Sequence, residues 1–321
     1  MHLSSSLALL TAATVQASSL QSRSSACTNS EVRLEWSNLT TSQQTSYLEA
    51  ELCLWNLPAE THLRNVTSRY MDLVALHQNL TDYVHWDGPF LPWHRYFMHT
   101  HQTLLRDQCD YTGPIPWWDE RKDAGAFSNA SIFSAETFGT ISGTAYNGTL
   151  FDQDESDYVC VTDGYFANTT LHIGFGSSDT THCLSRDVNN DMSASASTAK
   201  VAECNSYNNY TTMFDCVFQN PHQAGHSGVG GVMGDVSGSP ADPIFFLHHG
   251  FIDRNWWHWQ NQDRDARLYQ VNGHTTESEP EGGWVETTLN YTLTSYEIIP
   301  DTTIYHVMDT EGGYLCYTYD Y

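Results

Sequence analysis

The sequence HQNLTDYVHWDGPFLPWHR, residues 77–95, carries three histidines in two apolar segments that a Gly-Pro turn separates. His77 and His85 stand about two helical turns apart, so we expect them near one face of the same helix or of adjoining helices. His94 follows the turn and lies in the next helical pattern. Imidazole is the commonest neutral nitrogen ligand for copper, zinc, iron and nickel. This stretch therefore predicts a metal site built on a pair of helices.

A second histidine group lies farther along the chain, in HQAGH (residues 222–226) and DPIFFLHHGFIDR (residues 242–254). His222 and His226 are spaced i, i+4, so on a helix they share one face and can bind one ion together. His248 and His249 would point about 100° apart around a helix axis, so only one of them is expected to face that ion. Neither group contains a carboxylate or cysteine at comparable spacing, which disfavours magnesium, calcium and thiolate-rich zinc sites. The pattern predicts two metal ions held by nitrogen ligands.

Hydrophobic periodicity and helix start and stop signals predict a largely helical chain. The predicted helices cover about residues 31–57, 68–85, 91–109 and 207–218, and a further one starts at Asp242. Asp242 and Pro243 suit the N-cap and the first helical position. The Gly-, Ser- and Asn-rich residues 139–200 predict long surface loops, and alternation within 284–299 predicts one or two strands.

The charge excludes several classes of partner. Over 321 residues the formal net charge is −25, and phosphate binding needs clustered Lys and Arg, so nucleic acid is not expected as a partner. Anionic membrane surfaces are disfavoured for the same reason, and no uninterrupted apolar stretch reaches about 18 residues. A small neutral or cationic substrate is compatible with this charge.

Three features predict a secreted, extracellular glycoprotein. Residues 1–17, with the apolar run LALLTAATV, are expected to be a signal peptide, with a short pro-segment to about residue 26. Eight cysteines without CxxC spacing indicate disulfides formed in an oxidising compartment, and only the short loops Cys160–Cys183 and Cys204–Cys216 suggest pairings. N-glycans are expected on some of the Asn-x-Ser/Thr sites, which are Asn38, Asn65, Asn79, Asn129, Asn147, Asn168, Asn209 and Asn290.

FLPWHR, together with HQAGH and DPIFFLHHGFIDR, resembles the two copper motifs of the type-3 copper family, which contains tyrosinases, catechol oxidases and hemocyanins. The resemblance implies a mainly α fold, with a four-helix bundle core that holds a dinuclear copper site, long loops and a few short strands. It assigns His77, His85 and His94 to one copper and His222, His226 and His249 to the other. In the family the second histidine of the HH pair is the ligand, so His248 is expected to lie just outside the coordination sphere.

The resemblance also covers the ends of the chain. Tyr317-Thr318-Tyr319 looks like the tyrosine motif that closes the family's catalytic core, and Arg33 is expected to stack on it. Residues 27–321 are accordingly expected to form a single copper domain without the C-terminal lid domain of many relatives.

The implied activity is oxidation of o-diphenols (catechols) to o-quinones, with reduction of O2 to water and no organic cofactor. Many relatives place a glutamate four residues before the ligand at position 222, where this chain has Phe218, followed by Gln219. A phenol must lose its proton before it is hydroxylated, and a carboxylate-held water is one proposed base. Gln223 stands where asparagine accompanies strong monophenol hydroxylation in some relatives, and Ser227 is a further candidate on the substrate side. These departures predict weak monophenol hydroxylation.

Two further residues bear on the copper ligands. Tyr83, two residues before His85, excludes the Cys–His thioether found in some relatives. Asp253, four residues after His249, is a candidate to orient a ligand imidazole, and a carboxylate on the helix surface is the equally weighted alternative.

Other functions stay open at this level. Within the enzyme class the alternatives are a true tyrosinase and an o-aminophenol oxidase. Outside it, a dioxygen carrier would share the copper site, a zinc hydrolase would use the same imidazoles, and a binding glycoprotein would need no metal.

Overall fold

The computed structural model describes residues 27–85, 88–142, 144–145 and 158–321. The expected signal peptide and pro-segment, Trp86-Asp87 of the predicted turn, and the glycosylation site at Asn147 lie outside the described residues. Among the helices that are described, none is long and apolar enough to cross a membrane.

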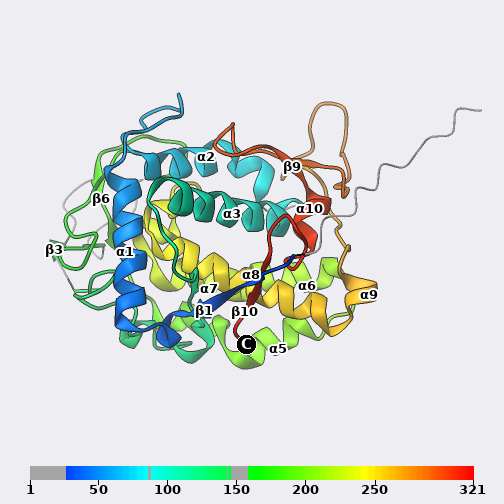
Figure 1. Cartoon of the computed structure of the whole chain (residues 1–321), viewed down its shortest axis with the longest axis horizontal. Helices are drawn as coiled ribbons and strands as arrows, with labels where there is room; N and C mark the ends of the chain where they lie inside the picture. The colour runs from blue at the N-terminus through cyan, green and yellow to red at the C-terminus, as the bar shows by residue number, and fades with distance from the viewer. Residues whose placement is uncertain (1–26, 86–87, 143, 146–157) are drawn as a thin grey trace, which may run out of the picture.

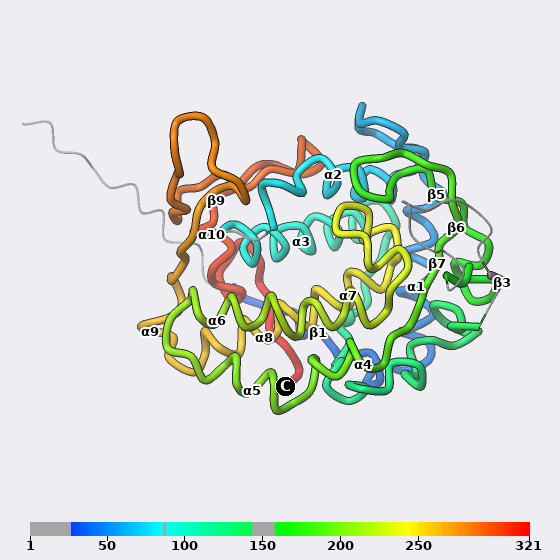
Figure 2. The backbone as a smooth tube through the Cα atoms, turned by 180° about the vertical axis from the view of Figure 1, so that it is seen from behind, coloured from blue at the N-terminus to red at the C-terminus, as the bar shows by residue number. Residues whose placement is uncertain are grey.

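Four helical segments form the core. They are α2 (Arg69–Val84), α3 (Phe90–Gln108), α8 (Ile244–Gln262), and α6 (Tyr210–Val217), which continues through a π-helical turn (Phe218–His222) into α7 (Gln223–Val229). Strands β1 and β10 cross the front of the molecule in Figure 1, whereas α6 and α7 lie in front in the reverse view of Figure 2. The predicted mainly α fold with few short strands is confirmed.

The helix boundaries follow local capping chemistry. The helices predicted over 68–85 and 91–109 agree with α2 and α3 to within one residue, and Ser68 caps α2 by accepting from the Met71 amide. The helix predicted from residue 207 starts instead at Tyr210, because the Asn209 side chain caps it. The last long helix starts at Ile244, two residues after the predicted N-cap, although the Asp242 carboxylate does accept the Ile244 amide at 3.2 Å.

The prediction of one helix over residues 31–57 is wrong at its start. The chain begins with strand β1 (Glu31–Glu35) and a 3-10 turn (Trp36–Asn38), and only then forms α1 (Thr41–Asn56). β1 pairs in parallel with β10 (Tyr317–Tyr319) on one side and with β2 (Pro116–Trp117) on the other. Both partner strands are remote in sequence, so no local sequence pattern predicts this strand.

Residues 139–200, which were predicted to form long surface loops, contribute in part to the hydrophobic core. It contains short antiparallel strands in two small sheets, and Leu171, Ile173 and Leu184 are buried. The strands are β3 (Thr144–Ala145), β4 (Val159–Cys160), β5 (Thr170–Leu171), β6 (His182–Cys183) and β7 (Ser185–Arg186), and the helices are α4 (Asn190–Ser193) and α5 (Thr198–Asn205). The prediction failed because these strands are only two residues long, too short to show alternation.

The C-terminal part adds α9 (Arg264–Arg267), α10 (Ile304–Met308) and an antiparallel pair of strands, β8 (Thr292–Leu293) with β9 (Thr302–Thr303). β8 lies inside the tail for which one or two strands were predicted. The second strand of the pair follows that tail.

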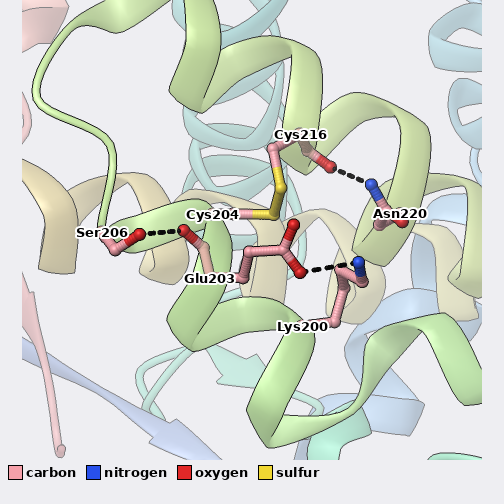
Figure 3. Close-up of a disulfide and its surroundings, with 6 residues drawn as sticks. All are labelled: Lys200, Glu203, Cys204, Ser206, Cys216 and Asn220. Atoms are coloured by element: carbon pink, nitrogen blue, oxygen red, sulfur yellow. Dashed lines mark hydrogen bonds and ion pairs between the residues drawn. A yellow bond between two sulfur atoms is a disulfide. The ribbon is translucent and has the colours of Figure 1, made fainter.

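Four disulfides tie the chain together. They are Cys27–Cys316, Cys53–Cys109, Cys160–Cys183 and Cys204–Cys216, so both suggested pairings are confirmed. Figure 3 shows Cys204–Cys216 joining α5 to α6, with the Asn220 side chain donating to the Cys216 carbonyl at 2.9 Å. This crosslink fixes the end of α6 directly before the π-helical turn that carries His222.

A buried ionic cluster joins strands β1 and β10 to the core helices. Asp253 on α8 accepts from Arg95 Nε at 2.5 Å through one oxygen and from the hydroxyls of Tyr317 and Tyr319 through the other. Arg33 on β1 lies 3.4 Å above the centre of the Tyr317 ring, so the expected stacking of Arg33 on the tyrosine motif is confirmed. Both oxygens of Asp253 are thus engaged, and its predicted role in orienting a ligand imidazole is wrong.

Replacement of Asp253 should destabilise the fold strongly. Asp253→Ala leaves two buried guanidinium groups without their carboxylate, and breaking a buried pair in this way costs about 3–5 kcal/mol. Urea unfolding measures the loss. The matched control is Asp309→Ala, which removes a partly exposed partner of Arg264 and should cost less than about 1 kcal/mol. Equal losses in the two variants would contradict a structural role for the cluster.

Candidate metal centre

The first histidine group lies where α2 ends and α3 begins. His77 lies within α2, His85 forms its C-cap, and His94 lies in the second turn of α3. One ring nitrogen from each lies within 4.8 Å of the others. Each Nδ1 is paired with a backbone carbonyl, namely His77 with Ser237 at 2.8 Å, His85 with Thr81 at 3.0 Å and His94 with Phe90 at 2.8 Å. A carbonyl can only accept, so each Nδ1 carries the proton and each Nε2 carries the lone pair.

The second group comes from the π-helical turn, α7 and α8. Ring nitrogens of His222, His226, His248 and His249 all lie within 4.8 Å of one another. His226 Nδ1 is paired with the Met233 carbonyl at 2.8 Å, the same arrangement as in the first group. Within the described part of the chain, neither nitrogen of His222 or His249 has a hydrogen-bond partner.

The two groups form one centre. The rings of His94 and His249 stack with their centres 4.4 Å apart and their planes 10° from parallel. Phe90 packs against His94 and His222, at centre distances of 4.5 and 4.7 Å. Phe245 packs against His249 at 4.2 Å. The imidazoles therefore share one aromatic pocket.

Burial keeps these imidazoles neutral. Desolvation lowers the pKa of His85 to about 4 and that of His226 to about 3. It also lowers the pKa of His94 far below its ordinary value, and repulsion from His85 and His77 adds to this effect. Neutral imidazole is the form that binds a metal ion, so the protonation state suits ligation at neutral pH.

The arrangement fits two metal ions with nitrogen ligands. His77 Nε2 and His94 Nε2 face each other at 3.4 Å, although both carry lone pairs, and the His222 and His249 nitrogens are buried without partners. Buried polar atoms without partners are costly, and a cation at each group would satisfy them. Neither group of potential ligand atoms includes a carboxylate or a sulfur.

His248 differs from the other members of its group. Its Nδ1 lies 2.6 Å from Glu120 Oε1, and both side chains are fully buried. Burial and the neighbouring carboxylates of Asp119 and Asp123 raise the pKa of Glu120 well above its ordinary value. His248 is thus held by a carboxyl group, whereas His77, His85, His94 and His226 are held by backbone carbonyls.

The candidate residues on the substrate side separate into two sets. Phe218 is buried and stacks on His222 with ring centres 4.9 Å apart, so the structure brings it to the centre. Gln219 is exposed and points away from the core. Gln223 is also exposed, and its side chain donates to Ser227 Oγ at 2.6 Å, which places these two on one surface of α7 beside the ligand-bearing face.

Two features of the centre were not predicted from the sequence. They are the position of Glu120 beside His248 and the contact of Phe90 with both histidine groups. Glu120 belongs to a 3-10 turn (Glu120–Lys122) that is far in sequence from both histidine groups. Its only signal was an Asp-Glu pair after the apolar run Ile115–Trp118, in which Glu120 is the second residue. Phe90 stood inside the quoted FLPWHR motif, but its contact with the second group depends on tertiary packing.

Comparison with known proteins gives a consistent picture. The common central domain of tyrosinase matches residues 67–262. The tyrosinase-like protein phomQ1 of Diaporthe leptostromiformis is 34% identical over 92% of this chain and 78% of its own length. The N-acetyl-6-hydroxytryptophan oxidase ivoB of Emericella nidulans is 33% identical over 100% of both chains. A polyphenol oxidase variant from Thermothelomyces thermophila superposes with a TM-score of 0.79 at 27% identity, covering 90% of this chain and 88% of that one.

The metal-free protein should lose stability as the pH falls below about 6.5. The unfolded histidines take up protons near that pH, whereas the buried His226 does so only near its lowered pKa of about 3. Between these values the unfolded state binds more protons than the folded state. Each such imidazole therefore lowers the free energy of unfolding by up to about 1.4 kcal/mol for every unit by which the pH falls. Urea unfolding at pH 7, 6 and 5 measures this slope.

His226→Gln should reduce the slope by up to that amount. The control is His62→Gln, which replaces an exposed histidine and should leave the slope unchanged, because solvent reaches this side chain in both states. A slope that is the same in all three proteins would show that the buried imidazoles do not carry the pH dependence.

Proposed function

Because the chain belongs to the tyrosinase family of type-3 copper proteins, we propose that it is a dicopper oxidase that converts o-diphenols to o-quinones and reduces O2 to water. The observation that carries the proposal is the stack of His94 on His249, which joins two all-imidazole groups into one buried centre. A phenolic or catecholic small molecule and O2 are the proposed substrates.

In this proposal, His77, His85 and His94 hold one copper ion, and His222, His226 and His249 hold the other. When bound, the copper pair supplies the dioxygen binding and electron transfer that the side chains lack. Backbone carbonyls orient His77, His85, His94 and His226 by their Nδ1 atoms and direct Nε2 toward the metal. Phe90 and Phe245 keep water from the imidazoles, and Phe218 offers an aromatic surface beside His222.

We propose that oxidation of diphenols is the stronger activity. Position 218, where many relatives place a water-holding glutamate, is a buried phenylalanine packed on His222, and Gln219 beside it is exposed. Gln223 is bound to Ser227, so its amide is oriented along the surface of α7. Since a monophenol must be deprotonated and a catechol is oxidised more readily, the lack of a carboxylate here favours the catechol.

The proposal extends to the cellular location. We propose that residues 1–17 direct secretion and that the mature protein carries N-glycans. Each of the glycosylation-site asparagines within the described residues is exposed, namely Asn38, Asn65, Asn79, Asn129, Asn168, Asn209 and Asn290. Four disulfides are compatible with folding in an oxidising compartment.

Oxygen uptake with a matched pair of substrates tests the activity. Copper-loaded protein should consume O2 immediately with dopamine, and more slowly or after a lag with tyramine, which lacks the second hydroxyl. His222→Ala should abolish both reactions. Equal initial rates without a lag would indicate a true tyrosinase, and reversible O2 binding without turnover of dopamine would indicate an oxygen carrier.

A carboxylate at position 218 should shift the balance toward monophenols. Phe218→Glu places a candidate base beside His222, so the ratio of tyramine to dopamine turnover should rise about 10-fold or more. Phe218→Gln is the control, because it removes the same aromatic ring without adding a base. A ratio that rises equally in both variants would assign the effect to lost packing.

A further inference from the structure

A cavity separate from the histidine centre gathers basic side chains on this acidic protein. It measures about 320 Å³ and lies between α5, α8 and the 3-10 turn Glu120–Lys122. Its basic side chains are Arg121, Arg254 and His258, and no carboxylate of the described residues lines it. The whole chain carries 13 Lys and Arg against 38 Asp and Glu, so a cavity lined by two arginines and no acid differs sharply from the average composition.

Arg254 is buried with its two terminal nitrogens unpaired. The residue is 6% exposed, and its Nε donates to the backbone oxygen of Tyr321 at 2.8 Å. Its guanidinium carbon lies 5.8 Å from the centre of the Trp117 ring and 5.9 Å from that of Tyr321. Among the described residues, neither Nη atom has a hydrogen-bond or ion-pair partner. Burying a cation without an anion is costly, so an anion in the cavity would stabilise this arrangement.

The carboxylate of Asp119 acts on Arg254 from a distance but is already engaged by other groups. Its Oδ1 accepts from Arg121 Nε at 2.6 Å. Its Oδ2 accepts from Arg121 Nη2 at 2.8 Å and from the Tyr321 hydroxyl at 3.1 Å. Asp119 therefore compensates the charge of Arg121, whereas the charge of Arg254 has no carboxylate in contact with it within the described part of the chain.

The basic groups of the cavity repel one another. Burial, together with repulsion from Arg121, lowers the pKa of Arg254 below its ordinary value. Burial, together with repulsion from Arg254 and Arg121, lowers the pKa of His258 in the same way. Shifts of this sign mark a region of positive potential, which a bound anion would neutralise.

The remaining lining suits a small molecule with an anionic headgroup. Val201 and Ala202 on α5 form an apolar wall. Asn205 is 4% exposed, and its Oδ1 is buried without a partner among the described residues, so it can accept from a ligand hydroxyl. The volume lies at the lower end of the range for small-molecule sites.

We propose that this cavity binds the oxyanion headgroup of a small molecule, a carboxylate or a phosphate, with Arg254 as the main contact. Arginine presents paired N–H groups that match either headgroup with two parallel hydrogen bonds. Arg254 and His258 follow His249 on α8 by about 8 and 14 Å along the helix axis, so the site is distinct from the histidine centre. The proposal does not depend on the dicopper function.

Calorimetric titration with inorganic phosphate and with acetate tests the proposal, with chloride at equal ionic strength as the reference. The copper-loaded protein is kept in the Cu(I) state, because this soft ion has little affinity for oxyanions. At least one of the two anions should bind once per chain, at least about 10-fold more tightly than chloride. The anion that binds more tightly identifies the headgroup.

Three variants locate the binding site. Arg254→Gln removes the main contact and should weaken binding at least about 10-fold. Ala202→Trp fills the cavity from its exposed wall without removing a charge, and should weaken binding to the same extent. Arg64→Gln is the control, because it removes an arginine whose side chain is 69% exposed and lies outside the cavity, and it should leave the affinity unchanged.

The proposal is overturned if neither anion binds more tightly than chloride, or if binding persists unchanged in Arg254→Gln or Ala202→Trp. Equal weakening in Arg64→Gln would also overturn it, since the effect would then follow net charge and not the cavity. If Arg254→Gln does not fold, Ala202→Trp decides the result alone, because position 202 is exposed and its change removes no hydrogen bond.

Discussion

The pairing of histidine Nδ1 atoms with backbone carbonyls is the interaction on which the centre depends. It fixes the tautomer of His77, His85, His94 and His226 and directs their lone pairs into one buried space. His77 and His226 take their carbonyls from the segment between α7 and α8, whereas His85 and His94 take theirs from one turn earlier in the chain. The helices must therefore pack in one arrangement before the imidazoles can converge. The two histidine groups accordingly form only when the whole core is folded.

Holding several neutral imidazoles in a buried pocket is costly, and the remainder of the fold supplies a rigid frame. Asp253, Arg95 and Arg33 bind α8, α3 and β1 together in a buried cluster that is separate from the histidines. The disulfide Cys204–Cys216 fixes the end of α6, directly before the turn that carries His222. Desolvation lowers the pKa of the histidines and keeps them neutral, so the same burial that costs stability in the metal-free protein prepares the site for a metal ion.

Local sequence patterns were sufficient to predict the long helices, because the spacing of their side chains repeats within one or two turns. The i, i+4 spacing of His222 and His226 and the apolar runs around His94 indicated the helices that carry them. Contacts between remote segments could not be read in this way. The strand at Glu31–Glu35 depends on a partner at the other end of the chain, and Asp253 binds arginines from two other elements rather than an imidazole. Glu120 was missed for the same reason, because only the packing of its turn against α8 brings it to His248.

The central claim is that two copper ions occupy this centre, each held by three imidazoles. Anomalous diffraction from crystals of the copper-loaded protein, measured on both sides of the copper absorption edge, tests it most directly. We expect two peaks that appear only above the edge, one among the Nε2 atoms of His77, His85 and His94 and the other beside His222, His226 and His249. A single peak, a peak bonded to His248, or a signal that persists below the copper edge would contradict the account.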